Sequence, residues 1–132
     1  MSNFRLPDYR LKQKLLYVDK LNPSSLQSYG DSFLEEGRIP EALDFYLRAN
    51  NNSGLQKIKE IAFNSGDVMM FGQAAKALNL ELKPADWESI GKKAIELKKY
   101  LFARHALEKA GNEEMLNSLN NIMQKEVDEI KA

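Results

Sequence analysis

Residues 84–111, PADWESIGKKAIELKKYLFARHALEKAG, contain two apolar periods of helical spacing separated by a break at Lys98 and Lys99. Apolar or small residues recur at i, i+3, i+4, i+7 and i+10 in the first period, and at i, i+3, i+7 and i+10 in the second, which is the spacing of one helix face. These positions are Trp87, Ile90, Gly91, Ala94 and Leu97, then Tyr100, Ala103, Leu107 and Ala110. We predict two short helices folded back on each other, with the small residues Gly91 and Ala103 allowing close approach.

The same pattern occurs 61 residues earlier in the chain. The first helix repeats as Leu26, Tyr29, Gly30 and Phe33, and the second as Ala42, Tyr46 and Ala49. A separation of that size equals two units of about 30 residues, and periods in this range are typical of stacked helical pairs. A third unit is therefore expected between the two.

Residues 24–50 and 85–110 resemble the tetratricopeptide repeat family. Both carry a large residue, a large residue followed at once by a small one, and, after a turn, a small residue, a large one and an alanine. The resemblance implies an all-α fold: an α-α superhelix (solenoid) of about three antiparallel helix pairs, with an N-terminal helix and a C-terminal capping helix. The expected single domain spans residues 1–132, with repeats at about 24–52, 53–83 and 84–111 and the capping helix at 112–130.

The middle repeat matches the pattern least well. Aligning its turn glycine, Gly66, with Gly37 places Lys59 where the other repeats have glycine and Phe71 where they have alanine. A bulky side chain at that position prevents the same close approach. Either this pair packs more openly, or the register slips so that Ala62 and Ala74 take the small positions. We favour the alignment on the turn.

Two further helices are expected at the ends. Residues 8–21 place Leu11, Leu15 and Val18 on one face of a basic helix that caps the stack or docks an anionic surface, and residues 22–23, Asn-Pro, provide the next helix start. A stack of repeats leaves its last apolar face uncovered, so the helix at 113–130 is expected to cover it. The alternative use of that helix is homodimerisation through Met123, Val127 and Ile130.

Composition limits the function classes. The 19 basic and 19 acidic residues cancel, which argues against a nucleic-acid or anionic-membrane binder because such proteins need a basic field. The absence of cysteine excludes disulfides and thiolate metal sites. The sequence has no apolar run of the length that a membrane span needs, and Met1–Pro7 lacks the apolar core of a signal peptide. We expect a cytoplasmic protein.

The sequence offers no catalytic constellation. His105 is the only histidine, there is no HExxH motif, and no glycine-rich loop is suited to binding phosphate. His105 is expected to be exposed with a structural role. We therefore expect no enzyme activity, no metal and no cofactor.

The family resemblance implies a concave surface lined by the first helix of each repeat, which binds a peptide or partner helix. The matching positions are Gln27, Asp31, Leu34 and Glu35, then Gln56, Glu60, Phe63 and Asn64, then Glu88, Lys92, Ile95 and Glu96. We expect the apolar row of Leu34, Phe63 and Ile95, flanked by carboxylates, to bind a segment with basic flanks. The alternative is that these three side chains pack against neighbouring repeats. Asp31 and Glu60 disfavour the capture of a C-terminal carboxylate, a mode known in the family.

The sequence thus favours a non-catalytic protein–protein interaction module whose partner is a protein or peptide. The main alternative is a structural subunit that self-assembles through its terminal helices. RNA binding is disfavoured because an RNA-reading surface needs basic side chains, whereas the predicted groove has five acidic residues and one basic residue.

Overall fold

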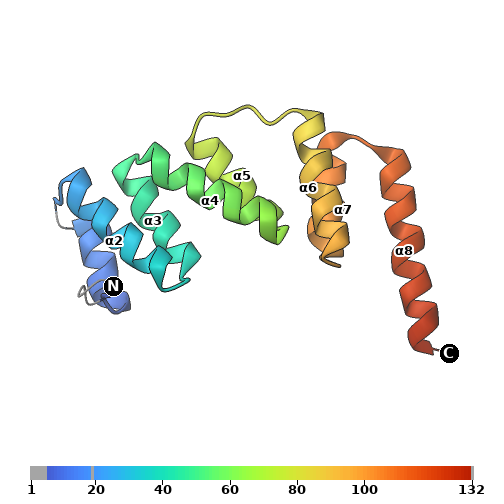
Figure 1. Ribbon diagram of the computed structural model, residues 1–132, viewed down its shortest axis with the longest axis horizontal. Helices are drawn as coiled ribbons and strands as arrows, with labels where there is room; N and C mark the ends of the chain where they lie inside the picture. The colour runs from blue at the N-terminus through green and yellow to red at the C-terminus, as the bar shows by residue number, and fades with distance from the viewer. Residues whose placement is uncertain (1–5, 19, 132) are drawn as a thin grey trace. The chain divides into compact units, whose positions relative to one another are not determined.

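The computed structural model describes residues 6–18 and 20–131, without the side chain of Val18. Every regular element in these ranges is a helix, which confirms the predicted all-α class. The elements are α1 (Tyr9–Gln13), the π-helical turn η1 (Lys14–Val18), α2 (Pro23–Glu35), α3 (Ile39–Ala49), α4 (Asn52–Ser65), α5 (Val68–Ala77), α6 (Pro84–Glu96), α7 (Tyr100–Ala110) and α8 (Glu113–Lys131), as Figure 1 shows.

The chain divides into two compact units, unit 1 (Met1–Ile58) and unit 2 (Lys59–Ala132), and the boundary lies inside α4. Unit 1 is built on the contact between α2 and α3, and unit 2 on the contacts of α6 with α7 and of α7 with α8. The single domain expected over residues 1–132 stays a prediction. The expected apolar position Val18 and the N-terminal residues 1–5 lie outside the described side chains.

All three helix pairs use the same two turns. A residue with positive φ follows the first helix of each pair and also the second. These residues are Gly37, Gly66 and Lys98 in the first group and Asn50, Asn79 and Gly111 in the second. After α4, the Gly66 N–H donates to the Phe63 carbonyl at 3.1 Å and the Asp67 N–H donates to the Ala62 carbonyl at 2.9 Å; the other five turns repeat this arrangement. It is the Schellman motif, which closes a helix by means of a left-handed residue.

The turns fix the register of the middle repeat. Gly66 follows Gly37 by 29 positions and Lys98 follows Gly66 by 32, while the two left-handed residues of each pair are always 13 positions apart. The favoured alignment of Gly66 with Gly37 therefore agrees with the backbone. The unequal spacing arises in the connection at residues 78–83, which is longer than the connection between α3 and α4.

In unit 1 the glycine of the repeat pattern faces a large side chain. Tyr46 of α3 is fully buried, and a β-carbon built on Gly30 of α2 would lie 2.7 Å from its Cε1 atom. Phe45 stacks on Phe33 with ring centroids 5.5 Å apart. A small residue is thus required at Gly30, as expected. It makes room for an aromatic ring, however, and not for the close approach of the neighbouring backbone.

The expected entry helix at 8–21 is shorter and irregular. An α-helical turn, α1, continues into the π-helical turn η1, and the consecutive residues Leu15 and Leu16 are both buried. The Lys12 ammonium donates a hydrogen bond to the Asp44 carboxylate at 2.8 Å, which ties α1 to α3. In the next helix, Asn22 accepts from the Ser25 N–H at 2.8 Å and Pro23 is the first helical residue, as expected.

The middle pair exchanges its large and small positions. Phe71 takes the place of Ala42 and Ala103, while Ala75 takes the place of Tyr46 and Leu107, so the large residue of the second helix moves one turn earlier. Phe71 and Ala75 are both buried. A register slip is therefore unnecessary to bury the pair.

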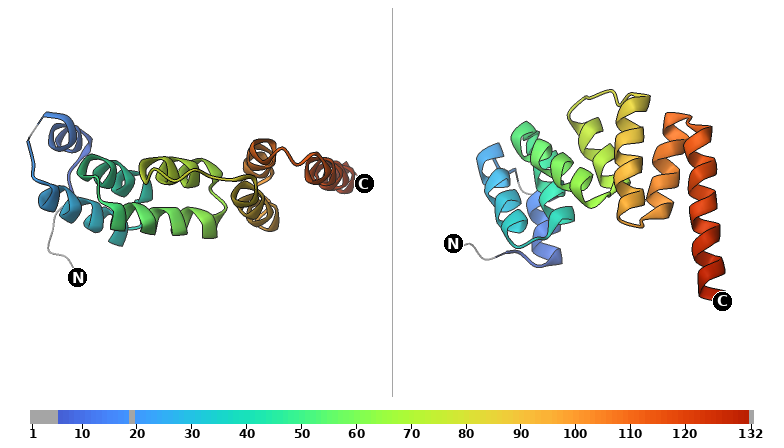
Figure 2. Two further views of the ribbon diagram at one scale, coloured as in Figure 1. Left: turned by 90° about the horizontal axis from the view of Figure 1, so that it is seen from above. Right: turned by 45° about the vertical axis from the view of Figure 1, so that its right-hand side comes forward.

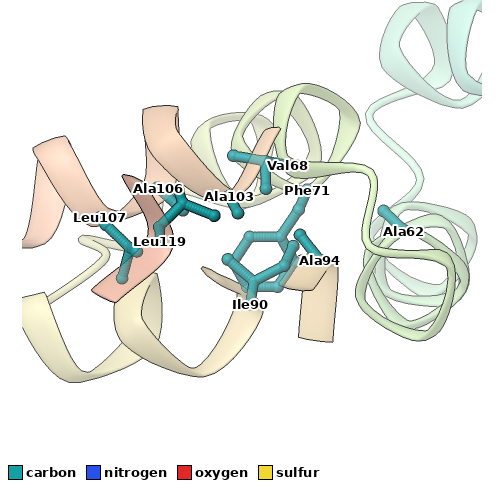
Figure 3. Close-up of a cluster of buried hydrophobic side chains, with 9 residues drawn as sticks. All are labelled: Ala62, Val68, Phe71, Ile90, Ala94, Ala103, Ala106, Leu107 and Leu119. Carbon is teal, nitrogen blue, oxygen red and sulfur yellow. The ribbon is translucent and has the colours of Figure 1, made fainter. Parts of the chain in front are cut away.

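The core of unit 2 is one apolar cluster drawn from α4 to α8 (Figure 3). Figure 3 shows Phe71 beside Ile90 and Ala94. Gly66 closes the gap to α6, because a β-carbon at Gly66 would lie 3.1 Å from the Ala94 Cα atom. The buried members are Ala62, Val68, Phe71, Ile90, Ala94, Ala103, Ala106, Leu107 and Leu119.

Helix α8 lies beside α7, as the views in Figure 2 show. Leu119 is fully buried, and Met115, Leu116 and Met123 pack against the cluster, so the first half of α8 covers the last pair as expected. In the second half, the side chain of Val127 is 42% exposed and that of Ile130 is 84% exposed. The apolar stripe of α8 therefore continues beyond the surface that it covers.

Candidate functional site

The twelve expected groove residues lie on α2, α4 and α6. Unit 1 carries Gln27, Asp31, Leu34, Glu35 and Gln56, and unit 2 carries Glu60, Phe63, Asn64, Glu88, Lys92, Ile95 and Glu96. Three of the unit 2 residues, all from the last two turns of α4, line one surface hollow of about 260 Å³. The four expected residues of α6 do not line it.

This first hollow, which we call the Phe71 hollow, is lined by Lys59, Glu60, Phe63, Asn64 and Phe71. Phe71 is buried, and the partly buried Phe63 meets it with ring centroids 6.0 Å apart and planes tilted by 53°. The Lys59 ammonium lies 5.5 Å from the Phe71 ring centroid, within the range of a cation–π contact. The hollow thus combines aromatic walls with a charged and polar edge.

Sequence reasoning did not include Phe71 and Lys59 among the site residues. Both had been recognised as departures from the repeat pattern, Lys59 at the glycine position and Phe71 at the alanine position. Both departures line the hollow, and Phe71 presents a ring at a position where the other pairs have a methyl group. The mismatch to the pattern was the signal for the site.

The expected carboxylates differ in their partners. Asp31 accepts a hydrogen bond from the Tyr46 hydroxyl, Glu88 accepts one from the Asn112 amide at 3.2 Å, and Glu96 pairs with Lys93 at 3.5 Å. Burial, together with this bond to Asp31, raises the pKa of Tyr46. Glu35 and Glu60 are exposed and have no ion pair within the described part of the chain. Among the five expected carboxylates, Glu35 and Glu60 are therefore the two with no side-chain hydrogen bond or ion pair recorded in the described part of the chain.

The expected apolar row is half-buried throughout. Phe63 and Ile95 both pack against the unit 2 cluster, and Leu34 in unit 1 is also half-buried. Each of these side chains is therefore partly packed within the protein and partly exposed. Phe63 alone of the three borders the Phe71 hollow.

A second hollow, of about 490 Å³, lies in unit 2 between α5 and the start of α6. We call it the Trp87 hollow. Its apolar walls are Gly72 and Ala75 of α5, Leu80 and Leu82 of the connection, and Trp87 of α6. Lys76, Asn79 and Glu81 complete its lining. It shares no lining residue with the Phe71 hollow.

His105 differs from its expected exposure. It is half-buried, and its ring meets Trp87 edge-on with centroids 6.3 Å apart. A histidine on this face of α7 therefore packs against the aromatic residue that starts the repeat. No cluster of three or more His, Cys, Asp or Glu side chains suited to a metal occurs among the described residues.

None of the helices in residues 6–18 and 20–131 combines the length and the apolar character that a membrane crossing requires. Comparisons of the chain with protein-family models, with curated protein sequences and with solved structures give no significant match. The likeness to known repeats therefore depends on the residues and turns described above.

Proposed function

We propose that this protein is a non-catalytic interaction module, built from helical repeats of the tetratricopeptide kind, that binds a peptide or helix of a partner protein. The observation that carries the proposal is the Phe71 hollow, where the half-buried ring of Phe63 and the buried ring of Phe71 lie beside the carboxylate of Glu60, which has no ion pair within the described residues. Exposed aromatic and apolar surface at a concave site is typical of docking surfaces for side chains of partner proteins.

The size of the hollow favours a side chain over a small molecule. Pockets that enclose small ligands measure about 300–1,000 Å³ and bury most of the ligand, whereas the Phe71 hollow measures about 260 Å³. The occupant in this proposal is a bulky apolar side chain that packs on Phe63 and Phe71. A basic residue next to it on the partner meets Glu60.

The repeat assignment is supported by the six matching Schellman turns and by the glycine-to-large-residue contacts in the first and third pairs. In the third pair, a β-carbon on Gly91 would lie 3.0 Å from Leu107 Cδ2, which parallels the contact of Gly30 with Tyr46. Both contacts are packing contacts and involve no catalytic group. In this proposal the protein needs no cofactor and acts in the cytoplasm, which fractionation of the native cell checks.

The experiment is affinity capture from the native cell with the wild-type chain and three variants. Phe63→Ser removes a wall of the hollow, Glu60→Lys reverses the free charge, and Met69→Ser is the matched control because Met69 is 51% exposed on α5 outside the hollow. We expect one partner to be retained by the wild type and Met69→Ser, and lost by Phe63→Ser and Glu60→Lys. Far-UV circular dichroism and Trp87 emission verify that each variant is folded. Equal recovery of every partner by all four proteins would exclude the Phe71 hollow as the site.

A second candidate function is self-assembly through α8, and the exposed Val127 and Ile130 favour it. Light scattering at several concentrations tests this function directly. Assembly through α8 predicts a mass that rises with concentration in the wild type and stays monomeric in an Ile130→Lys variant. A monomer at every concentration in the wild type argues against it.

A further inference from the structure

The Trp87 hollow exists because the middle repeat lacks two large side chains. In the first pair, the positions equivalent to Gly72 and Ala75 are the buried residues Leu43 and Tyr46. A β-carbon at Gly72 would have a single neighbour, Trp87 Cη2 at 3.5 Å. The space next to α5 is therefore open where the first repeat is filled by its own side chains.

The longer connection after α5 supplies the opposite wall. Its residues Leu80 and Leu82 border the hollow, and the side chain of Leu80 is 45% exposed. Trp87, half-buried, also borders the hollow, and its ring meets that of His105 of α7 in a T-shaped contact with centroids 6.3 Å apart. Truncated side chains on one helix and an apolar connection facing them produce a preformed apolar recess.

One positive and one negative side chain border the Trp87 hollow, and neither has an ion-pair partner within the described residues. Lys76 and Glu81 are exposed and belong to none of the ion pairs within the described residues. Small-molecule sites place a few convergent polar groups to orient the ligand, whereas the polar groups of Lys76, Asn79 and Glu81 all belong to exposed side chains. The hollow has the volume of a small-ligand pocket, about 490 Å³, but its polar groups are exposed rather than convergent on an enclosed ligand. The arrangement therefore suits an apolar anchor on a polypeptide better than a free small ligand.

We propose that the Trp87 hollow is a second docking site, which binds a bulky apolar side chain of a partner segment flanked by one acidic and one basic residue. The apolar side chain packs on Trp87 between Gly72 and Leu82. The acidic flank meets Lys76 and the basic flank meets Glu81, so the preferred segment has no net charge. The site shares no lining residue with the Phe71 hollow, where the Lys59 ammonium lies over the Phe71 ring and Glu60 is proposed to meet a basic residue.

The test uses a defined probe and a local reporter. Random short peptides displayed on phage are selected on the wild-type chain, and the enriched sequences are synthesised without Trp or Tyr. Trp87 is the only tryptophan of the chain, so its emission follows binding at this hollow directly. We expect saturable changes in emission with peptides that carry one Phe, Leu or Met between an acidic and a basic residue.

Four variants decide the outcome. Gly72→Leu fills the hollow and should weaken binding by about tenfold or more, as expected when a central anchor is excluded. Gly72→Ala adds only a methyl group in ordinary contact with Trp87 and should lose less affinity. Lys76→Glu should shift the preference to peptides in which the acidic flank is replaced by a basic one. Met69→Ser, at an exposed residue of α5 outside both hollows, should leave the affinity unchanged.

Several results would overturn the proposal. One is the absence of enriched peptides with a common apolar anchor, and another is binding that Gly72→Leu leaves unchanged. Peptides that bind only through Phe63 would support the proposed function while refuting the second site. If no captured partner depends on Phe63 or Glu60 while the Trp87-dependent peptides still bind, the proposed function is refuted and the second site stands.

Discussion

The ring of Tyr46 occupies the space that a side chain at Gly30 would need, with 2.7 Å between Cε1 and a β-carbon built on the glycine. Gly54 of α4 is held against the same ring, so two glycines from different helices border one aromatic side chain in unit 1. The Tyr46 hydroxyl then donates to Asp31, the residue next to Gly30. A single side chain of α3 thus depends on the absence of side chains in both neighbouring helices.

Alanine substitutions at two helical glycines should have opposite effects. Gly30→Ala forces the new methyl group against Tyr46, and overpacking of a core costs about 1–3 kcal/mol. Gly72→Ala meets only Trp87 at 3.5 Å, and replacing glycine by alanine in a helix stabilises by about 1 kcal/mol. Urea unfolding followed by circular dichroism measures both changes. A stabilising Gly30→Ala would contradict the packing of Tyr46 described for unit 1.

The stability of unit 1 should fall at alkaline pH because of Tyr46. Burial, and then the hydrogen bond to Asp31, raise the pKa of Tyr46 above the ordinary value of 10.0. Below that value both the folded and the unfolded chain hold the proton, so the contribution is complete. As the pH rises above it, the unfolded chain loses the proton first, and the free energy of unfolding falls by at most about 1.4 kcal/mol for each pH unit.

Tyr46→Phe tests this linkage. The variant should unfold more easily at neutral pH because it lacks the bond to Asp31, but its stability should decline less between neutral pH and the alkaline range. The pKa of Tyr100 is also raised, through its hydrogen bond to Glu126, so Tyr100→Phe serves as the companion variant. Parallel pH profiles for the wild type and Tyr46→Phe would refute the role of this tyrosine.

Gly66 should be the least replaceable of the turn glycines. Gly37, Gly66 and Gly111 all have positive φ, where a side chain costs about 1 kcal/mol. A β-carbon has no neighbour within 4 Å at Gly37 or Gly111, whereas at Gly66 it lies 3.1 Å from the backbone of Ala94. Gly66→Ala should therefore cost about 2–4 kcal/mol and Gly37→Ala about 1 kcal/mol. Urea unfolding followed by circular dichroism measures both losses, and equal losses at the two sites would contradict the close contact of Gly66 with α6.

A substitution at Lys98, in the turn after α6, should raise the stability of the protein instead of lowering it. Lys98 adopts φ of 59° at the position that glycine occupies in the first two pairs. Lys98→Gly should relieve the left-handed strain and raise the stability of unit 2 by about 0.5–1 kcal/mol. The exposed Lys98–Glu126 pair, at 3.9 Å, contributes little that would be lost. Lys98→Ala is the control, because it removes the pair without relieving the strain and should not stabilise.

Much of the helical organisation could be predicted from local patterns in the sequence. Gly37 and Gly66 mark helix ends because few other residues adopt positive φ, and Asn22 and Pro23 mark a helix start by capping chemistry. The left-handed conformation of Lys98 could not be predicted from the sequence, because lysine has no preference for that conformation. The π-helical turn η1 was missed because the periodicity of Leu11, Leu15 and Val18 suits an α-helix.

The candidate site was less predictable because it depends on a substitution between helices. Glu60, Phe63 and Asn64 were found from their positions on α4, but the floor of the hollow comes from Phe71 on α5. The spacing of residues along α5 cannot show that the large side chain of Phe71 is compensated by the small side chain of Ala75 one turn later. The Trp87 hollow was not predicted from the sequence for the same reason. It arises where two large side chains are absent and a connection is longer, and neither feature forms a sequence motif.

The second half of α8 should depend on one hydrogen bond. The Tyr100 hydroxyl donates to Glu126 at 2.5 Å, and Glu126 follows the last core contact, Met123, by less than one turn. Tyr100→Phe removes the donor, so amide hydrogen exchange should become several-fold faster after Met123, where few buried contacts resist local opening. Exchange around the fully buried Leu119 should stay unchanged and serves as the internal control.

The same measurement separates a free helix end from an assembled one. If Val127 and Ile130 are covered by a second copy of the chain, exchange in the last turns of α8 should slow as the protein concentration rises, and Tyr100→Phe should have little effect at high concentration. If the stripe faces solvent, exchange should be independent of concentration and should respond fully to the loss of the Tyr100 hydroxyl. An equal acceleration along the whole of α8, Leu119 included, would instead mean that Tyr100 supports the docking of the entire helix against α7.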